Sequence, residues 1–532
     1  MPRISARPRQ NVGTFVAPDG FTNDPWAFRM SNRTGAAARA AIVTVPALLS
    51  IFICLHGLSD KPLWLDEVIT YNRSNLPVAD LIANSLHSKQ LPGYFIVEKY
   101  FDGPIINEWA LRFPSTVFTA LSVLIIGLIA AEIASPIAGL FAGSIAALAP
   151  INVQFGQEAR PYALAGGFIM FALWGLHRII RAAECQQAQT LRSSRLGWAA
   201  YGLSTIAATN VILVSVIWFL VANIVMGAIF VISPHARIIV RKWLIWQIVI
   251  ALALVPALVG IYHYSGHDPF DGHRWVPAST LQHIWSVLSA AYFFRFSDVS
   301  SFALLDSRAP WLGSIVAALA CWGTYQLRHA WKFATLLVAS AAAMPIALLL
   351  ISVFHPFWVT RYLLWSIGPY CVLAGIGLYH LPRYASAASA MIVLAGGLMN
   401  LAPYYTADTK PRWDMAAQYL ASRASSGELI VMNDKAAHYV LAAYTRRYVV
   451  EPLNIVTGPG LPSDVASNGI WAVYGRTGQG AIPPVSVLLQ SWSARGNPNE
   501  HVKFGKDIIA IHFVDESLRS AQADNHGRER QE

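Results

Sequence analysis

The sequence has 532 residues, of which 55% are hydrophobic and only 13% charged, whereas soluble domains are about half apolar and about a quarter charged. Long apolar stretches recur between residues 40 and 404, and inside a bilayer each must satisfy its own backbone hydrogen bonds, which requires helices. The net charge of +10 lies in small clusters beside these stretches and forms no continuous basic face, which argues against nucleic-acid binding.

The first predicted element is a membrane span preceded by a basic cytoplasmic tail, residues 1–39. The apolar run after this tail is too long for the core of a signal peptide and lacks a clear cleavage site, which indicates an uncleaved helix. Stretches of span length then recur along the chain. The predicted spans, about eleven in number, lie near residues 40–57, 112–133, 136–154, 162–181, 197–209, 211–233, 243–262, 310–327, 333–353, 362–379 and 386–404.

The distribution of Lys and Arg orients these spans, because cytoplasmic connections carry more positive charge than external ones. With the N-terminus inside, short external connections hold only Arg160 and Arg361, and the alternation requires that 197–209 and 211–233 both cross. The odd number of crossings places the C-terminus outside. The loop 58–111, the loop 263–309 and the region after 405 then share the extracytoplasmic side.

Two of these external regions have recognisable patterns. The first external loop, 58–111, contains VADLIANSLHS and YFIVEKYF, whose apolar residues recur every three or four positions, as in helices that lie in the membrane interface. Residues 405–516 are predicted to form a small α/β domain, and 517–532 a disordered tail. The predicted helices of the α/β domain are WDMAAQYLASRAS and KAAHYVLAAYT, and its predicted strands are GELIVMND, RRYVVEP, IWAVYGR and IIAIHFV.

The predicted fold is therefore a mainly α membrane protein, with its transmembrane domain over residues 40–404 and a small extracytoplasmic α/β domain after it. Three polar clusters fall at the same predicted membrane face. They contain the adjacent carboxylates Asp66 and Glu67, the pair Glu158 and Arg160, and Arg361 among aromatic residues. Taken singly, these clusters also fit an exposed helix cap, a self-satisfied ion pair and a snorkelling arginine. Together, carboxylates beside phosphate-binding cations indicate a transferase site.

A fourth cluster contains potential metal ligands in a Gly- and Pro-rich loop. Its members are His263, His267, Asp268, Asp271 and His273. Their spacing fits no metal-binding motif, so the sequence predicts no defined site there, although a divalent metal is left open.

Four motifs, in this order, resemble the GT-C superfamily of membrane glycosyltransferases. They are LWLDE at 63–67, ALRFPS at 110–115, APINVQFGQEARPYAL at 149–164 and TRYLLWSIGP at 360–369. The superfamily includes protein O-mannosyltransferases, lipid A aminoarabinose transferases and bacterial transferases that modify lipopolysaccharide cores. The resemblance implies a GT-C-like bundle, a polyprenyl-phosphate sugar as donor, and Asp66 as the catalytic carboxylate with Glu67 beside it. The region after 405 looks like the periplasmic domains appended to many bacterial relatives.

One segment departs from the family pattern. Relatives often carry His-Pro-Pro-Leu-Tyr-Tyr late in the first external loop, where this chain has Gln90-Leu91-Pro92-Gly93-Tyr94-Phe95. The role of that histidine therefore falls to Gln90, or to the nearby Lys89 or His87.

The mechanism follows from the chemistry of transfer. Asp66 is predicted to take the proton of an acceptor hydroxyl, while Glu67 orients a partner or helps to hold a cation. Arg160 and Arg361 are predicted to bind the donor phosphate through their guanidinium groups. Direct attack on the donor sugar would invert its anomeric carbon. The further residues predicted to bind or orient substrate are Glu158, Tyr162, Gln90, Lys89, Tyr94 and Tyr362.

The expected enzyme transfers a hexosyl or pentosyl group to a glycolipid, lipopolysaccharide or exopolysaccharide acceptor at the periplasmic face of a bacterial inner membrane. A transporter or flippase for a lipid-linked saccharide is the chief alternative. Few ionisable residues interrupt the predicted spans, and no inverted repeat is visible, which argues against transport. A protein O-glycosyltransferase and a non-catalytic receptor remain as further alternatives.

Overall fold

The computed structural model describes most of the chain. The described residues are 34–185, 188–265, 276, 278–296, 305, 307–425, 428–432, 434–449, 453–457, 469–475, 499–505 and 507–514. The chain divides into two units, one ending at Ala41 and the other running from Ile42 to Glu532. Residues 1–33 of the predicted N-terminal tail, the predicted tail 517–532 and four members of the fourth cluster, His267, Asp268, Asp271 and His273, fall outside the described residues. Residues 34–39, predicted as the end of the N-terminal tail, are helical.

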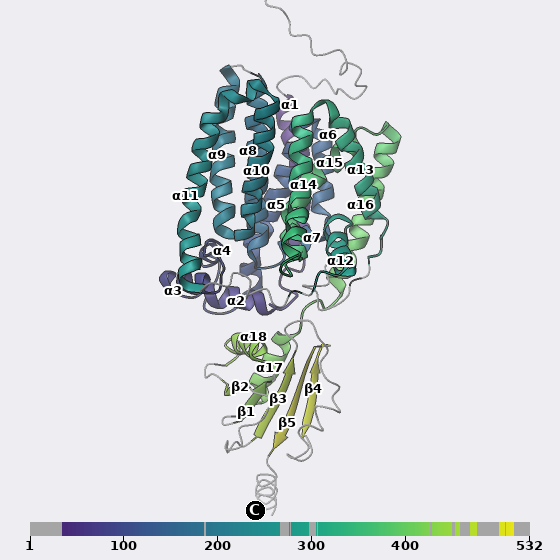
Figure 1. Ribbon diagram of the computed structural model, residues 1–532. Helices are drawn as coiled ribbons and strands as arrows, with labels where there is room; N and C mark the ends of the chain where they lie inside the picture. Colours follow the sequence, from purple (N-terminus) through teal and green to yellow (C-terminus); the bar gives the residue numbers. More distant parts are fainter. Residues whose placement is uncertain are drawn as a thin grey trace, which may run out of the picture. The chain divides into compact units, whose positions relative to one another are not determined.

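Helices dominate the region before residue 407, as Figure 1 shows. The α-helices are α1 (Thr34–Leu55), α2 (Leu65–Ser74), α3 (Val78–His87), α4 (Gly93–Glu98), α5 (Glu108–Ile133), α6 (Pro136–Ala147), α7 (Pro150–Gly156), α8 (Pro161–Cys185), α9 (Ala188–Val211), α10 (Val216–Ile232), α11 (Val240–Ser265), α12 (Leu281–Tyr292), α13 (Leu312–Gln326), α14 (Trp331–Ser352), α15 (Ile367–Tyr379) and α16 (Arg383–Thr406). Short 3-10 helices are η1 (Leu213–Ser215), η2 (Pro234–Ile239), η4 (Leu327–His329) and η5 (Thr360–Ser366).

Seven of the described helical segments are long and apolar enough to cross a membrane, and the bent pair α6–α7 makes an eighth span if it is counted as one. The chain is therefore a multi-pass membrane protein. The three other predicted spans coincide with α1, α9 and α13, which are helical but shorter or less apolar. Every apolar stretch predicted from the sequence is thus helical, although the stretch 136–154 is broken into two helices.

The centre of the helical region is α15, in which nearly every residue is buried. It packs against α5, α6 and α13 (Figure 1). Glycines allow the closest of these approaches, since a Cβ on Gly377 would meet the Leu319 carbonyl oxygen at 1.9 Å. Such contacts between small residues are typical of helix packing in membranes. Most of α11, by contrast, exposes apolar side chains, as expected of a helix that faces lipid.

A break between α6 and α7 positions one of the predicted site motifs. The two helices meet at an angle of 63°. Ala149 has an extended backbone because a residue before proline is disfavoured in the helical region, and Pro150 then begins α7. The turn 157–160 follows α7, and the Ala159 carbonyl oxygen accepts a hydrogen bond from Thr70 of α2 (3.1 Å). This turn therefore lies against the first external loop.

The first external loop contains three short helices, α2, α3 and α4, two of which were predicted from their patterns. At the start of α2, the Trp64 amide donates to the Glu67 carboxylate (3.3 Å), which caps the first turn. Asp66 and Glu67 therefore sit side by side on the first turn of a helix.

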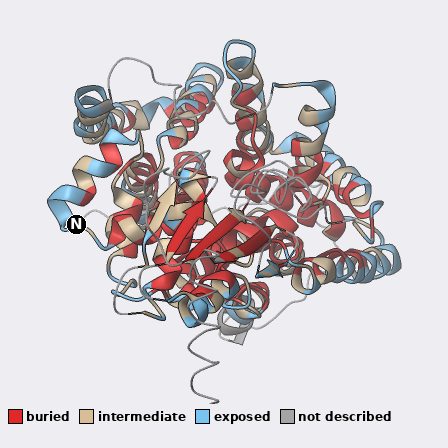
Figure 2. Cartoon of the chain, turned by 90° about the horizontal axis from the view of Figure 1, so that it is seen from below, coloured by how far each residue is buried: buried red, intermediate tan, exposed pale blue. Residues whose placement is uncertain are grey.

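The region after residue 407 is a small α/β domain, as predicted. It contains α17 (Trp413–Arg423), β1 (Leu429–Met432), α18 (Lys435–Thr445), β2 (Ile455–Thr457), β3 (Gly469–Gly475), β4 (Glu500–Phe504) and β5 (Ile508–Val514). The strand order is β2-β1-β3-β5-β4. β1 is parallel to both of its neighbours, whereas β5 is antiparallel to β3 and β4. The central strands are buried (Figure 2).

Two details of this domain differ from the sequence prediction. The described part of RRYVVEP, 446–449, is a turn that ends α18, with the Val449 amide bonded to the Thr445 carbonyl oxygen (3.0 Å); strand β2 comes later. β4 was not predicted, because its sequence EHVKF has three charged or titratable side chains and lies at the edge of the sheet.

Candidate active site

Asp66, Arg160 and Arg361 converge from three distant parts of the sequence. Asp66 lies on the first turn of α2, Arg160 ends the turn before α8, and Arg361 lies in η5. An Asp66 carboxylate oxygen is 3.1 Å from Arg361 Nη1 and 3.5 Å from Arg160 Nη2. Arg160 also donates to the Asp66 carbonyl oxygen (3.2 Å). The structure thus brings together one predicted catalytic carboxylate and both predicted phosphate-binding cations.

Aromatic rings surround the two guanidinium groups. The Tyr162 ring centroid is 5.6 Å from Arg361 Cζ and 5.9 Å from Arg160 Cζ. Tyr362 packs edge-on against Tyr162, and Phe357 stacks on Tyr362. Rings at this distance stabilise cations and exclude water from them. Tyr162 therefore lies against both arginines, and Tyr362 packs against Tyr162.

The two adjacent carboxylates have different surroundings, because neighbouring helical residues point about 100° apart. The Asp66 side chain is 24% exposed, whereas that of Glu67 is completely buried. Asp66 therefore faces the space where a substrate can reach it. Glu67 points into the protein, away from that space.

Glu67 is saturated with hydrogen bonds. Its Oε1 accepts from Arg112 Nε (2.8 Å) and from the Ala159 amide (3.0 Å). Its Oε2 accepts from Arg112 Nη2 (2.8 Å) and from Lys410 Nζ (2.7 Å), besides the capping bond described above. Burial alone would raise the pKa of Glu67, but Arg112 and Lys410 outweigh burial and lower this pKa to about 2. Glu67 is therefore a permanent anion that joins four segments.

Glu158 is the second buried carboxylate near the site. Its Oε2 atom has no hydrogen-bond partner among the described residues. Burial raises the pKa of Glu158 to about 7, against the opposing effect of Lys410 and Arg361. A carboxyl group with this pKa exchanges a proton near neutrality, so Glu158 can hold or release one.

Gln90, one of the three residues predicted to replace the family histidine, is held by another arginine. Arg73 of α2 donates to Gln90 (2.7 Å), Asn84 (2.8 Å) and Ser88 (2.9 Å). Lys89 adopts a left-handed backbone with φ of 56°, and Tyr94 is fully buried. No described hydrogen bond or ion pair joins Gln90 to Asp66, so these residues line a neighbouring part of the first external loop.

Sequence reasoning assigned no role to Arg73, Arg112 or Lys410. The signal for Arg112 was present, because a charge inside the apolar stretch of α5 is costly unless it has a partner. Arg112 indeed also donates to the carbonyl oxygens of Leu58 (2.8 Å) and Lys61 (2.7 Å). Lys410 offered no such signal, because it lies in a polar connection beyond the last span.

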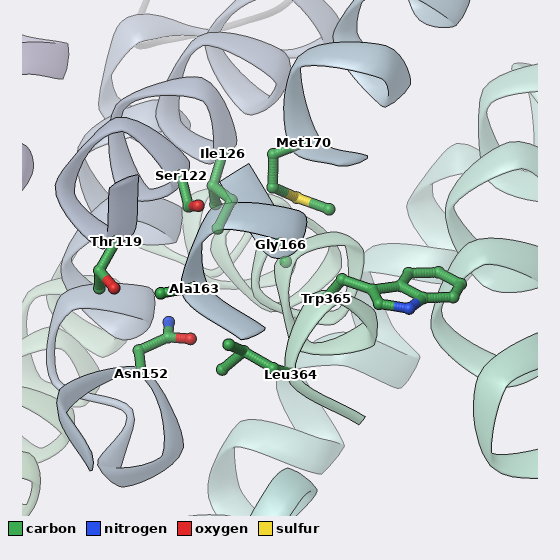
Figure 3. A pocket seen from close by; sticks show the side chains of 10 residues that line it. Thr119, Ser122, Ile126, Asn152, Ala163, Gly166, Met170, Leu364 and Trp365 are labelled. Carbon is green, nitrogen blue, oxygen red and sulfur yellow. The ribbon is translucent and has the colours of Figure 1, made fainter. Parts of the chain in front are cut away.

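A small cavity lies among α5, α7, α8, η5 and α15 (Figure 3). Its volume is about 20 Å³, enough for about one water molecule. Asn152 of α7 and Thr119 of α5 contribute polar groups to its lining, and Leu364 of η5 an apolar one. A cavity of this size is too small for a sugar.

The described residues contain no group of three or more His, Cys, Asp or Glu side chains arranged to hold a metal ion. Of the fourth cluster, His263 alone is described; it lies near the end of α11 and its ring meets that of Tyr264 edge-on.

Solved structures share this architecture. ArnT from Cupriavidus metallidurans, a lipid A aminoarabinose transferase, superposes in its apo state with a TM-score of 0.59 and 12% identity, over 91% of this chain and 99% of ArnT. The same protein bound to undecaprenyl phosphate superposes with a TM-score of 0.56 and 13% identity, over 90% of this chain and 98% of ArnT.

An archaeal oligosaccharyltransferase, AglB from Archaeoglobus fulgidus, is also similar. Its complex with an inhibitory peptide and a dolichol-phosphate gives a TM-score of 0.52 and 11% identity, over 82% of this chain and 69% of that one. No protein-family model and no curated protein sequence matches the chain. At these identities the likeness concerns the fold. The predicted fold class is confirmed: a GT-C-like helical bundle with a small C-terminal α/β domain.

Proposed function

We propose that this protein is a membrane glycosyltransferase that moves a sugar from a polyprenyl-phosphate donor to an acceptor hydroxyl. The observation that carries the proposal is the partly exposed Asp66 carboxylate held between two arginines whose side chains are at most 10% exposed. A carboxylate can take a proton, and guanidinium groups can bind a phosphate, which are the two tasks of this reaction. The fold shared with ArnT and AglB supports the same class.

The donor would bind through its phosphate. Arg160 and Arg361 offer planar guanidinium groups that match phosphate oxygens. Their present partner is Asp66, so an incoming phosphate would share these cations with the carboxylate. The solved complexes of ArnT with undecaprenyl phosphate and of AglB with a dolichol-phosphate support a lipid-linked phosphate as the donor class.

The transfer itself is a single displacement. Asp66 takes the proton of the acceptor hydroxyl while its oxygen forms a bond to the anomeric carbon, and the bond from that carbon to the phosphate oxygen breaks. The polyprenyl phosphate leaves with the bonding electrons, and the arginines stabilise its charge. One displacement inverts the anomeric configuration. Glu67 holds the first turn of α2 in place and does not itself face the substrate.

The remaining predicted residues act around this centre. Tyr162 and Tyr362 keep water from the arginines, and Glu158 binds or orients the acceptor through its free oxygen. Gln90, Lys89 and Tyr94 contribute to the substrate space from the first external loop. The site faces the periplasm of a bacterial inner membrane, with the N-terminus in the cytoplasm. The acceptor is a glycolipid, lipopolysaccharide, exopolysaccharide or protein.

The test is a transfer assay on the purified full chain in lipid nanodiscs. Radiolabelled undecaprenyl-phosphate hexoses and pentoses are incubated with candidate acceptors, with and without a chelator. The proposal expects a labelled glycosylated product with inverted configuration, lost in Asp66→Asn and kept in the control Asp80→Asn, which changes an exposed aspartate of α3. Transbilayer movement of a labelled lipid-linked saccharide without any product would reject the proposal in favour of a flippase.

A further inference from the structure

Lys410 lies in the connection between α16 and α17, where the membrane region passes into the α/β domain. It is 343 positions away from Glu67 in the sequence, yet its Nζ is 2.7 Å from Glu67 Oε2. The Lys410 side chain is only 4% exposed. A surface lysine contributes little through an ion pair, but a buried one is fixed in place by its partner.

A second contact attaches the α/β domain to the same stretch of the first external loop. The Tyr444 hydroxyl of α18 accepts a hydrogen bond from the Leu63 amide (2.6 Å) and donates to Glu108 (3.0 Å). Arg447 forms an ion pair with Glu108 (2.8 Å). Leu63 and Glu67 bracket Asp66, so both sides of the candidate catalytic residue are held by residues from beyond the last span.

The packing extends these polar contacts. Leu63 and Val68 of the first external loop share one buried hydrophobic cluster with Trp413 of α17 and with Leu441 of α18. Ala159, which precedes Arg160, belongs to the same cluster. The α/β domain and the site therefore have a common core.

We infer that Lys410 is a positioning residue of the transferase site, through which the α/β domain sets the position of Asp66. The inference rests on the proposed function. Lys410 touches no reacting atom; it holds Glu67, which caps α2 through the Trp64 amide and binds the Ala159 amide. Loss of the ammonium group leaves Glu67 with Arg112 as its one cation among the described contacts. The first turn of α2 then loosens, and Asp66 loses its place opposite Arg361.

The test compares Lys410→Met with the control Lys435→Met, which changes an exposed lysine at the start of α18. Hydrogen–deuterium exchange is measured on peptides covering α2 and the turn 157–160. The inference expects the exchange rate of these peptides to be about tenfold faster in Lys410→Met than in the wild-type chain. In the control variant the exchange rate should equal that of the wild-type chain. In the transfer assay, kcat falls by about tenfold or more, because small displacements of a reacting group are costly. KM for the donor changes less than threefold, since Arg160 and Arg361 keep their charges.

A double-mutant cycle separates positioning from general damage. In a Glu67→Gln background, Lys410→Met should add less than a twofold loss in kcat, because its partner is already altered. If Lys410→Met does not accumulate, Lys410→Gln takes its place. Unchanged exchange and unchanged kcat in a folded variant, or fully additive losses in the cycle, would overturn the inference. If the wild-type chain forms no product, the proposed function fails, and the exchange measurement still decides whether Lys410 positions α2.

Discussion

Replacing Asp66 by Asn separates the two tasks assigned to the site. In the wild-type chain, Arg361 Nη1 donates to the Asp66 carboxylate at 3.1 Å. The Asn amide keeps an oxygen that can accept this hydrogen bond, but it cannot take a proton. Loss of a general base slows a reaction by about 10²–10⁴-fold, equivalent to about 3–5 kcal/mol of activation free energy. Because the Asp66 side chain is 24% exposed and Asn keeps an acceptor for Arg361, Asp66→Asn should cost less stability than loss of the fully buried Glu67 anion.

Donor binding should respond in the opposite direction. In the wild-type chain the Asp66 carboxylate competes with a phosphate for Arg160 and Arg361. Asp66→Asn removes this competing charge, so the affinity for undecaprenyl phosphate should stay the same or rise. The assays are product formation from radiolabelled donor and equilibrium binding of undecaprenyl phosphate, with Asp80→Asn as control. Transfer at the wild-type rate would refute the role of Asp66 as base; loss of binding would refute the competition between carboxylate and phosphate.

Three further predictions concern the surrounding charges. Arg361→Gln should weaken binding of undecaprenyl phosphate by about tenfold, because one charge-assisted hydrogen bond is lost; unchanged affinity would place the phosphate elsewhere. Glu67→Gln should lower the free energy of unfolding by about 3 kcal/mol, visible as a lower apparent melting temperature, because Arg112 and Lys410 lose their buried anion. The pKa of Glu158, raised to about 7, means that the folded chain binds an extra proton between about pH 4.5 and pH 7. Stability should therefore fall as pH rises through this window, and Glu158→Gln should flatten that slope in melting curves recorded from pH 5 to pH 8.

The helical region was accessible from the sequence because its signal is strong. Runs of apolar residues of span length can satisfy their backbone only as helices, and each such run is helical in the structure, with one broken between α6 and α7. The α/β domain was less accessible. Short strands such as β4 carry polar side chains at a sheet edge, and RRYVVEP has the composition of a strand but closes α18 as a turn.

The candidate site was only partly predictable. Loop charge placed Asp66, Arg160 and Arg361 on one membrane face, but a shared face is not a contact. Their meeting depends on the bend between α6 and α7 and on the 3-10 geometry of η5, which a single sequence does not specify. The divergence of Asp66 and Glu67 followed from helical spacing. The ion pair of Glu67 with Lys410 could not be predicted in this way, because Lys410 reaches Glu67 only through the folded arrangement of the chain.

The most direct test of the central claim is a cryo-electron microscopy structure of the full chain in nanodiscs with undecaprenyl phosphate. The account predicts the phosphate within hydrogen-bond distance of the guanidinium groups of Arg160 and Arg361, next to the carboxylate of Asp66. A phosphate bound away from both arginines, or at the opposite ends of the helices, would contradict it.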